Sequence, residues 1–506
     1  MVEGILSLPK TFTGNRALML EEPLIFERQS SGGGVDIDDK VLDGKTTRLG
    51  ELEREDNIGL PDLSEPDVVR HFVRLSQKNY AIDSGIFPLG SCTMKHNPRL
   101  NEKMARLDGF ADIHPLQPTS TVSGALALMD MLAHWLKTLT GMPGIALSPK
   151  AGAHGELCGL MTIGSALEAR GERSSRTRVL VADSAHGTNP ATAALLGFDV
   201  TAIPTTPDGR MDVEAFGAEV DKSVAAVMLT NPNTCGLFER DCKRIADDIH
   251  EIGGYFYCDG ANFNAMIGKV RPSDLGVDAM HLNLHKSCST PHGGGGPGSG
   301  PVVFSEALTP YIPVPFVIRD NNGYKLVEQI EDAGESMPFG RLAGFHGQMG
   351  MFVRAMAWLM SHGADGLRQV AEDAVLNANY IMSRLQDVMT TPFEGPCMHE
   401  AIFDDRFLKA YDIETLDFAK AMIDEGYHPM TIYFPLTVSG AMLVEPTESE
   451  SRASLDLFID TMRHLASIVQ SGKKDLFTKA PVYAPRRRLD DTAAARNPVL
   501  RWHKRL

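Results

Sequence analysis

Between residues 178 and 286, short apolar runs alternate with helical patterns, and this alternation constrains the fold more than any other feature of the sequence. The apolar runs include TRVLVADS, VAAVMLTNPN and GYFYCD, and segments with helical spacing, such as ERDCKRIADDIHEIG, separate them. Strands that alternate with helices in this way form mostly parallel sheets with helices on their faces. We therefore predict an α/β fold for the central part of the chain.

Four of the predicted strands end in polar clusters. These clusters carry His186, Thr188, Asn231, Asp259 and Lys286. Open α/β sheets bind their ligands at the carboxyl ends of the strands. The sequence therefore predicts a ligand site at this edge of the sheet, with an apolar strand over residues 279–284 leading directly into His285 and Lys286.

Lys286 and Asp259 suggest the chemistry of this site. A lysine amine can form a Schiff base with a carbonyl, and pyridoxal phosphate needs such a lysine for its aldehyde and an acid for its ring nitrogen. Both residue types are also common as solvated groups at strand ends, so the pair alone is a weak signal. His186 is either a buried structural imidazole or a ring stacked on a cofactor, and its place among the strand ends favours the second interpretation.

Two further stretches offer binding groups. The small-residue turn at Gly152, Ala153, His154 and Gly155 precedes a predicted helix over about 155–170. Backbone N–H groups at a helix start bind anions, so this turn suits a cofactor phosphate, although many such turns are only tight connections. The loop FPLGSCTMKHNP is either a connector or a pocket lining, with four candidate residues: Ser91, Cys92, Thr93 and Lys95.

The length of 506 residues predicts two or three domains. We expect an N-terminal arm with helices over 1–95, of which the first 60 residues form an extended arm, and a large α/β domain over 96–340. A smaller α+β domain follows over 341–480, and its patterns include long helices and a strand in GAMLVEP. Residues 481–506 form an extended tail.

Composition excludes several classes of protein. A net charge of -16 argues against a nucleic-acid or anionic-membrane partner. Seven scattered cysteines without a CxxC pair do not resemble a disulfide framework, and no signal peptide or long apolar span is evident, so we expect a cytoplasmic protein. No phosphate-binding loop of a nucleotide-binding module is present. His281 and His285 lie too far apart on a predicted strand to indicate a metal site.

Several stretches together resemble one family, the pyridoxal-phosphate-dependent P-protein of the glycine cleavage system. The resemblance is to the second subunit of its two-subunit bacterial type and covers nearly the whole chain. It is carried by GIFPLGSCTMKHNP, AGAHGE, DSAHGTNPA, MLTNPNTCGLFER, DGANFNA, HLNLHKSCSTPHGGGGPGSGPV and MLVEPTE. It implies a fold-type-I enzyme with a mostly parallel, seven-stranded type of sheet and a smaller α+β C-terminal domain.

The resemblance also implies roles for individual residues. Lys286 would bind pyridoxal phosphate covalently, Asp259 would pair with the ring nitrogen, and His186 would stack on the ring. The phosphate cradle falls on residues 153–155, with Thr188 and His285 as further contributors, and Asn231 is a partner for the ring hydroxyl by analogy. The loop that carries Ser91, Cys92, Thr93 and Lys95 would line the substrate channel.

The implied reaction is decarboxylation of glycine, followed by transfer of the aminomethyl group to the lipoyl disulfide of the H-protein. The implied partners are the H-protein and a first P-protein subunit, in an α2β2 heterotetramer. Two alternatives remain: another fold-type-I amino-acid decarboxylase, and a non-catalytic subunit. The runs LHKSCSTPHGGGGPGSGP and DSAHGTNPA argue against the first, and the presence of Lys286, Asp259 and His186 together argues against the second.

Overall fold

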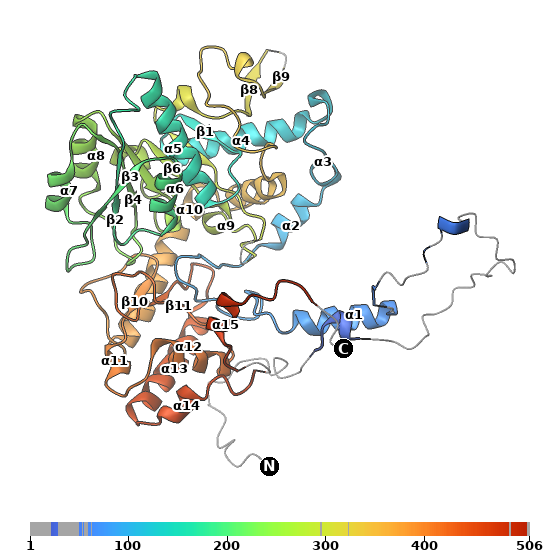
Figure 1. The fold of residues 1–506 in the computed structure, drawn as a ribbon, viewed down its shortest axis with the longest axis vertical. Coiled ribbons are helices and arrows are strands. Elements are labelled where there is room, and N and C mark those ends of the chain that lie inside the picture. Colours follow the sequence, from blue (N-terminus) through green and yellow to red (C-terminus); the bar gives the residue numbers. More distant parts are fainter. Residues whose placement is uncertain are drawn as a thin grey trace.

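The computed structural model describes residues 22–28, 50–52, 54, 59–61, 63–293, 296–321, 323–484 and 487–502. A large α/β body and a smaller α+β body make up most of this structure, and α10 (Met349–Leu385), which is kinked at Gly363, runs through both (Figure 1). No helix in these ranges is both long and apolar enough to cross a membrane.

The large body contains a seven-stranded sheet with the order β1-β7-β6-β5-β4-β2-β3. Neighbours from β3 to β6 pair in parallel, whereas β7 is antiparallel to both β6 and β1. The predicted mostly parallel sheet is therefore confirmed. The strands are β1 (Gly144–Ala146), β2 (Arg178–Ala182), β3 (Asp199–Ile203), β4 (Val224–Thr230), β5 (Tyr255–Asp259), β6 (Ala279–His281) and β7 (Val302–Phe304).

Alternate residues of the central strands enter two separate apolar cores. In β4, Val227 and Leu229 pack in one core with α4 (Ser123–Thr140), α8 (Cys242–Glu251) and the first half of α10. Ala226 and Met228 pack in the other core with α5 (Gly152–Ala169) and α6 (Thr188–Leu195). Successive strand side chains point to opposite faces, so a strand covered on both faces reads as one continuous apolar run. This explains why VAAVMLT predicted a strand correctly.

The register of the sheet aligns the polar ends of its strands. Thr230, the last residue of β4, pairs with Asp259, the last residue of β5. β6 lies beside β5 and ends at His281. The residues that follow these three strands therefore meet at one edge of the sheet.

The smaller body is built on an antiparallel sheet with the order β10-β12-β11. Its strands are β10 (Ala401–Phe403), β11 (Thr431–Ile432) and β12 (Met442–Val444), and its main helices are α12 (Thr415–Asp424) and α13 (Arg452–Gln470). The core of this body includes Ile381 and Leu385 from α10 and also Ile86 from the predicted N-terminal region. Leu89 pairs with Val444, so the chain just before residue 90 packs on the smaller body.

Helix α1 (Glu65–Ser76) extends away from both bodies (Figure 1). It begins as predicted at Ser64, whose side chain accepts a hydrogen bond from the N–H of Asp67. The described segment 22–28 contacts this helix through Glu22, which is 2.9 Å from His71, and Phe26 stacks on Trp502 of the tail. Most of the predicted extended arm over residues 1–60 lies outside the described residues.

Gly260 is the position where the sheet edge tolerates no side chain. A Cβ atom added there would lie 1.9 Å from the backbone oxygen of His281. We expect Gly260→Ala to destabilise the fold by about 2–3 kcal/mol, because backbone must shift to relieve the clash. Gly217→Ala is the matched control, since a Cβ there meets nothing within 4 Å. Thermal melting checks both variants, and equal melting temperatures for them would contradict this account.

Candidate active site

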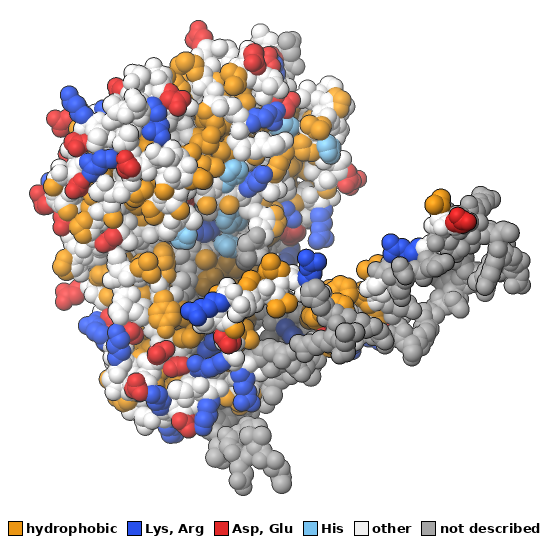
Figure 2. Space-filling model, in the orientation of Figure 1, with side chains coloured by type: hydrophobic (Ala, Val, Ile, Leu, Met, Phe, Trp, Pro, Cys, Tyr) orange, Lys and Arg blue, Asp and Glu red, His pale blue; other side chains and the backbone are white. Residues whose placement is uncertain are grey.

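A cavity of about 350 Å³ lies at the ends of β4, β5 and β6. Predicted residues in its walls are Ser91, Cys92, Ala153, His186, Thr188, Asp259, His285 and Lys286. The smaller body adds Thr431 and Phe434. On the face shown in Figure 2, histidine side chains gather where the two bodies meet. The cavity is therefore shared between both bodies.

Lys286 reaches the cavity from a single helical turn. The predicted strand over 279–284 is too long, because β6 ends at His281 and α9 (Leu284–Ser287) follows. The Lys286 Nζ donates a hydrogen bond to the backbone oxygen of Ser91 at 2.7 Å. A primary amine thus rests on a neutral acceptor inside the cavity, where it can react with a carbonyl group.

Asp259 is a buried carboxylate with several hydrogen-bond donors. It is 2% exposed, and it accepts hydrogen bonds from Asn189 Nδ2 and from the N–H of Ala261, both at 2.9 Å. Burial alone would raise its pKa, but nearby His281 and these donors outweigh burial, so the pKa of Asp259 lies below its usual value. A negative charge is therefore maintained at the inner wall of the cavity.

His281, which also lines the cavity, contacts that carboxylate. Its Nε2 lies 3.3 Å from Asp259 Oδ1, and its Nδ1 lies 2.7 Å from the hydroxyl of Tyr257. Burial lowers the pKa of His281, which favours a neutral ring. If the Tyr257 hydroxyl donates to Nδ1, the Nε2 proton faces Asp259. Sequence reasoning placed His281 on a strand and gave it no role.

His186, Thr188 and Glu156 form a chain of contacts in the cavity wall. His186 Nδ1 lies 2.9 Å from Thr188 Oγ1, and the Thr188 hydroxyl donates to Glu156 Oε1 at 2.7 Å. Glu156 is buried, and burial followed by the charge of Asp259 raises its pKa to about 8. Its only sequence signal was its place at the end of AGAHGE.

The raised pKa of Glu156 predicts a pH effect on stability. Its pKa increases from 4.5 to about 8 on folding, so its stabilising contribution is present below pH 4.5 and is lost as the pH rises towards 8. Glu156→Gln stays uncharged and avoids this loss. We therefore expect the melting temperature of the variant, relative to the unchanged chain, to increase between pH 5 and pH 8. For the exposed Glu168→Gln on α5, the difference in melting temperature from the unchanged chain should not change between pH 5 and pH 8. A difference that is equally constant for Glu156→Gln would refute the raised pKa of Glu156.

The start of α5 meets the cavity one or two residues earlier than predicted. Gly152 and Ala153 line it, and a Cβ on Gly152 would lie within 3.0 Å of both Asn283 and His281. His154 instead accepts a hydrogen bond from the N–H of Lys150, and Gly155 packs against His281. Of the expected phosphate cradle over residues 153–155, Ala153 is in the cavity wall and His154 and Gly155 are not, and the cradle itself stays a prediction.

Asn231 and His285 have different environments. Asn231 is fully buried, and its Oδ1 accepts a hydrogen bond from the N–H of Glu239 at 3.1 Å. Asn231 is not among the residues that line the cavity, whereas Thr230 and Thr234 are, and its contact with a ring hydroxyl stays a prediction. His285 does line the cavity, and burial together with neighbouring His292 lowers its pKa to about 3, so its ring is neutral.

The loop with the predicted channel residues divides into two parts. Ser91 and Cys92 line the cavity, whereas Thr93 and Lys95 line a neighbouring hollow of about 440 Å³. Lys95 is buried and pairs with Glu448 at 2.6 Å, and it also donates to the backbone oxygen of Ser287 at 2.9 Å. Lys95 therefore ties the smaller body to the turn that carries Lys286.

The cavity fits pyridoxal phosphate. It combines an amine, an ionised carboxylate and the start of an 18-residue helix, whose first N–H groups have no partner within the helix. Four buried polar atoms in its walls have no hydrogen-bond partner in the described part of the chain: Thr230 Oγ1, Asn262 Oδ1, Asn283 Oδ1 and His292 Nδ1. Such atoms bind water or the polar groups of a ligand, so the wall suits a polar cofactor.

Comparisons with solved structures define the class of fold. The structure matches a glycine decarboxylase (P-protein) of the glycine cleavage system with a TM-score of 0.67, at 20% identity over 85% of this chain and 93% of that one. It also matches a sphingosine-1-phosphate lyase of Burkholderia pseudomallei (TM-score 0.61, 15% identity, 85% and 97% covered). The profile of the aminotransferase class-V family matches residues 161–295. The chain thus has the type-I fold of pyridoxal-phosphate enzymes, and this fold implies that cofactor.

Sequence comparisons give the particular family. The profile of the glycine dehydrogenase C-terminal domain matches residues 370–482. A probable glycine dehydrogenase (decarboxylating) subunit 2 of Caulobacter vibrioides is 63% identical over 97% of this chain and 94% of its own length. Its counterpart in Oceanobacillus iheyensis is 47% identical over 95% and 99%. The chain belongs to the family of glycine dehydrogenase (decarboxylating) subunit 2.

Proposed function

We propose that this chain decarboxylates glycine with pyridoxal phosphate and transfers the remaining aminomethyl group to the lipoyl disulfide of an H-protein. The observation that carries the proposal is the meeting of the Lys286 amine, the ionised Asp259 and the start of α5 in one cavity. Family membership supplies the substrate, because relatives at up to 63% identity are described as decarboxylating glycine dehydrogenases.

The residues present define how the cofactor would be held. Lys286 would hold it covalently through its amine, Asp259 would pair with the ring nitrogen, and His186 would lie on the ring. The N–H groups of Gly152 and Ala153 would bind the phosphate. When bound, pyridoxal phosphate supplies an electron sink for the bond that breaks as carbon dioxide leaves.

Each residue then contributes by its charge or its position. The negative charge of Asp259, which His281 and Asn189 stabilise, would favour a proton on the ring nitrogen of the bound cofactor. The Lys286 amine lies on the Ser91 oxygen, a position from which it would deliver a proton to the substrate. The Phe434 and His186 ring centroids lie 5.7 Å apart, so the smaller body contributes an aromatic side chain to the wall of the site beside His186.

The second hollow suggests a path for the lipoyl arm. It shares His285 and His292 with the cavity, and Tyr80, Phe87 and Met94 give it an apolar lining. An extended dithiolane chain is itself largely apolar and suits such a lining. We propose that the arm approaches Lys286 from this side.

We also propose that the chain functions in an α2β2 assembly with a first P-protein subunit, because its relatives are described as subunit 2. Val69, Phe72 and Val73 are each at least half exposed on α1, which projects from both bodies (Figure 1). An apolar helix face of this kind favours a protein partner. A purified chain that is monomeric and fully active alone would refute the assembly.

The test of the proposed function is exchange of labelled bicarbonate into the carboxyl group of glycine. The chain is combined with a first P-protein subunit and lipoylated H-protein, and H-protein without its lipoyl group is the control. We expect exchange only with the lipoylated protein. Release of methylamine at full rate without H-protein would instead indicate an ordinary amino-acid decarboxylase, and no reaction in any mixture would indicate a non-catalytic subunit.

A further inference from the structure

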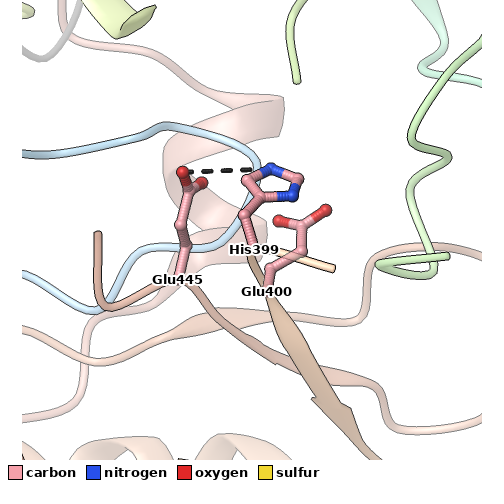
Figure 3. Close-up of side chains that lie close together, drawn as sticks. All are labelled: His399, Glu400 and Glu445. Atoms are coloured by element: carbon pink, nitrogen blue, oxygen red, sulfur yellow. Dashed lines mark ion pairs between the residues drawn. The ribbon is translucent and has the colours of Figure 1, made fainter. Parts of the chain in front are cut away.

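Three buried side chains of the smaller body converge beside the active site (Figure 3). His399 and Glu400 directly precede β10, and Glu445 directly follows β12, which pairs with β10. All three residues are 0% exposed, and His399 Nε2 lies 3.9 Å from Glu445 Oε1. None of them was predicted as functional from the sequence, and the reaction outlined above does not use them.

Each glutamate holds one point of the loop that faces Lys286. Glu400 Oε2 accepts a hydrogen bond from the N–H of Ser91 at 2.8 Å, and Glu445 Oε2 accepts one from the N–H of Thr93 at 3.0 Å. The Ser91 carbonyl, which accepts the hydrogen bond of Lys286, lies between these two points of the backbone. Two carboxyl groups of the smaller body are thus linked to the reactive amine through one short stretch of backbone.

The loop needs such support because its backbone is strained. Ser91 has a φ of 64° and Thr93 a φ of 40°, in the left-handed region that side chains disfavour. Gly90 beside them is pressed against Leu443 of β12, and its N–H donates to the Leu443 oxygen at 3.2 Å. The conformation that presents the Ser91 oxygen is therefore maintained by contacts with the smaller body.

The two carboxyl groups also lie close enough to influence each other. Burial and the charge of Glu445 raise the pKa of Glu400 well above its usual value, and burial raises the pKa of Glu445 to about 7. No lysine or arginine in the described ranges forms an ion pair with either group. At least one therefore carries a proton at neutral pH, and an uncharged carboxyl group still accepts an N–H hydrogen bond.

We propose that Glu400 and Glu445 are positioning residues that hold the Ser91 carbonyl against the Lys286 amine, so that the smaller body determines where this amine rests. Position and not charge is the basis of this role, because each glutamate acts through one oxygen that accepts a backbone hydrogen bond. The catalytic importance of the Lys286 amine rests on the proposed function. The hydrogen bonds that hold the Ser91 loop do not depend on it.

The test measures how fast the Lys286 amine reacts with an amine-directed reagent at a fixed pH. It uses the full chain stripped of cofactor, and peptide mass spectrometry reports Lys286 relative to the exposed Lys222. Glu400→Asp keeps the carboxyl group but is one methylene too short to reach the Ser91 N–H. We expect Glu400→Asp to increase the labelling of Lys286 about fivefold. This is the effect of losing the one hydrogen bond between the amine and the Ser91 oxygen when the loop shifts. Glu400→Gln keeps the acceptor oxygen and should remain within about twofold of the unchanged chain.

Glu239→Asp is the matched control. Glu239 is also buried and accepts a backbone hydrogen bond, from the N–H of Met211, but it is not part of this loop. Equal labelling in Glu400→Asp and the unchanged chain would overturn the proposal. An equal increase in Glu400→Gln would also overturn it, because the acidity of the carboxyl group and not the position of its oxygen would then matter. An equal increase in Glu239→Asp would overturn it as well, because it would indicate general destabilisation. Labelling does not require cofactor, so failure of this proposal is distinguishable from failure of the proposed function.

Discussion

Lys286→Ala is expected to reduce the exchange of bicarbonate into glycine by at least about a thousandfold, as loss of a covalent catalytic group does. Among the described residues, Lys286 is the only lysine in the cavity wall, and its amine lies 2.7 Å from a backbone oxygen. Without this amine the cofactor would have no covalent attachment, and the site would lose the group that delivers a proton. The exchange rate is measured with the first subunit and lipoylated H-protein present.

The matched control is Lys222→Ala, which removes an exposed amine outside the site. It should retain full exchange. Both variants should melt at the temperature of the unchanged chain, since neither lysine fills a core. Exchange by Lys286→Ala within tenfold of the unchanged chain would show that another group carries the chemistry.

Asp259→Asn is expected to lower the exchange rate by about a hundredfold or more, because it removes the charge that holds a proton on the cofactor ring. The amide nearly preserves the shape of the side chain, so the hydrogen bond from Ala261 can persist. The effect should fall mainly on kcat and less on KM for glycine, because the charge acts on the bond-breaking step.

Asp278→Asn provides a comparison within the same sheet. Asp278 is also buried, lies 2.7 Å from His250 and accepts a hydrogen bond from the N–H of Phe256, but it is not in the cavity wall. It should lose stability while keeping its exchange rate per folded molecule. Equal losses of exchange in the two variants would mean that Asp259 acts only through folding.

The sequence predicted the sheet because its strands are buried on both faces and therefore appear as continuous apolar runs. It also predicted the main cavity residues, since the register that pairs Thr230 with Asp259 brings strand ends together. Asn231 shows the limit of this reasoning. Its place after β4 was correct, but the direction of its side chain depends on a contact with Glu239 that spacing does not determine.

Other features depend on contacts between distant parts of the chain. Glu400 contacts Ser91 across 309 positions, and Lys95 contacts Glu448 across 353. Neither periodicity nor local spacing reports such pairs. The single turn α9 was missed for a different reason, since four residues are too few to show a helical period. His281 and Glu156 were overlooked because their importance arises from burial beside Asp259.

The most direct test of the central claim is to add pyridoxal phosphate to the purified chain, reduce with borohydride and map the modified peptide. Reduction makes a lysine-bound cofactor permanent, so mass spectrometry can locate it. We predict one pyridoxyl group per chain, on Lys286, and none in Lys286→Ala. Modification spread over several surface lysines, or none with the first subunit also present, would contradict the assignment of this cavity as a pyridoxal phosphate site.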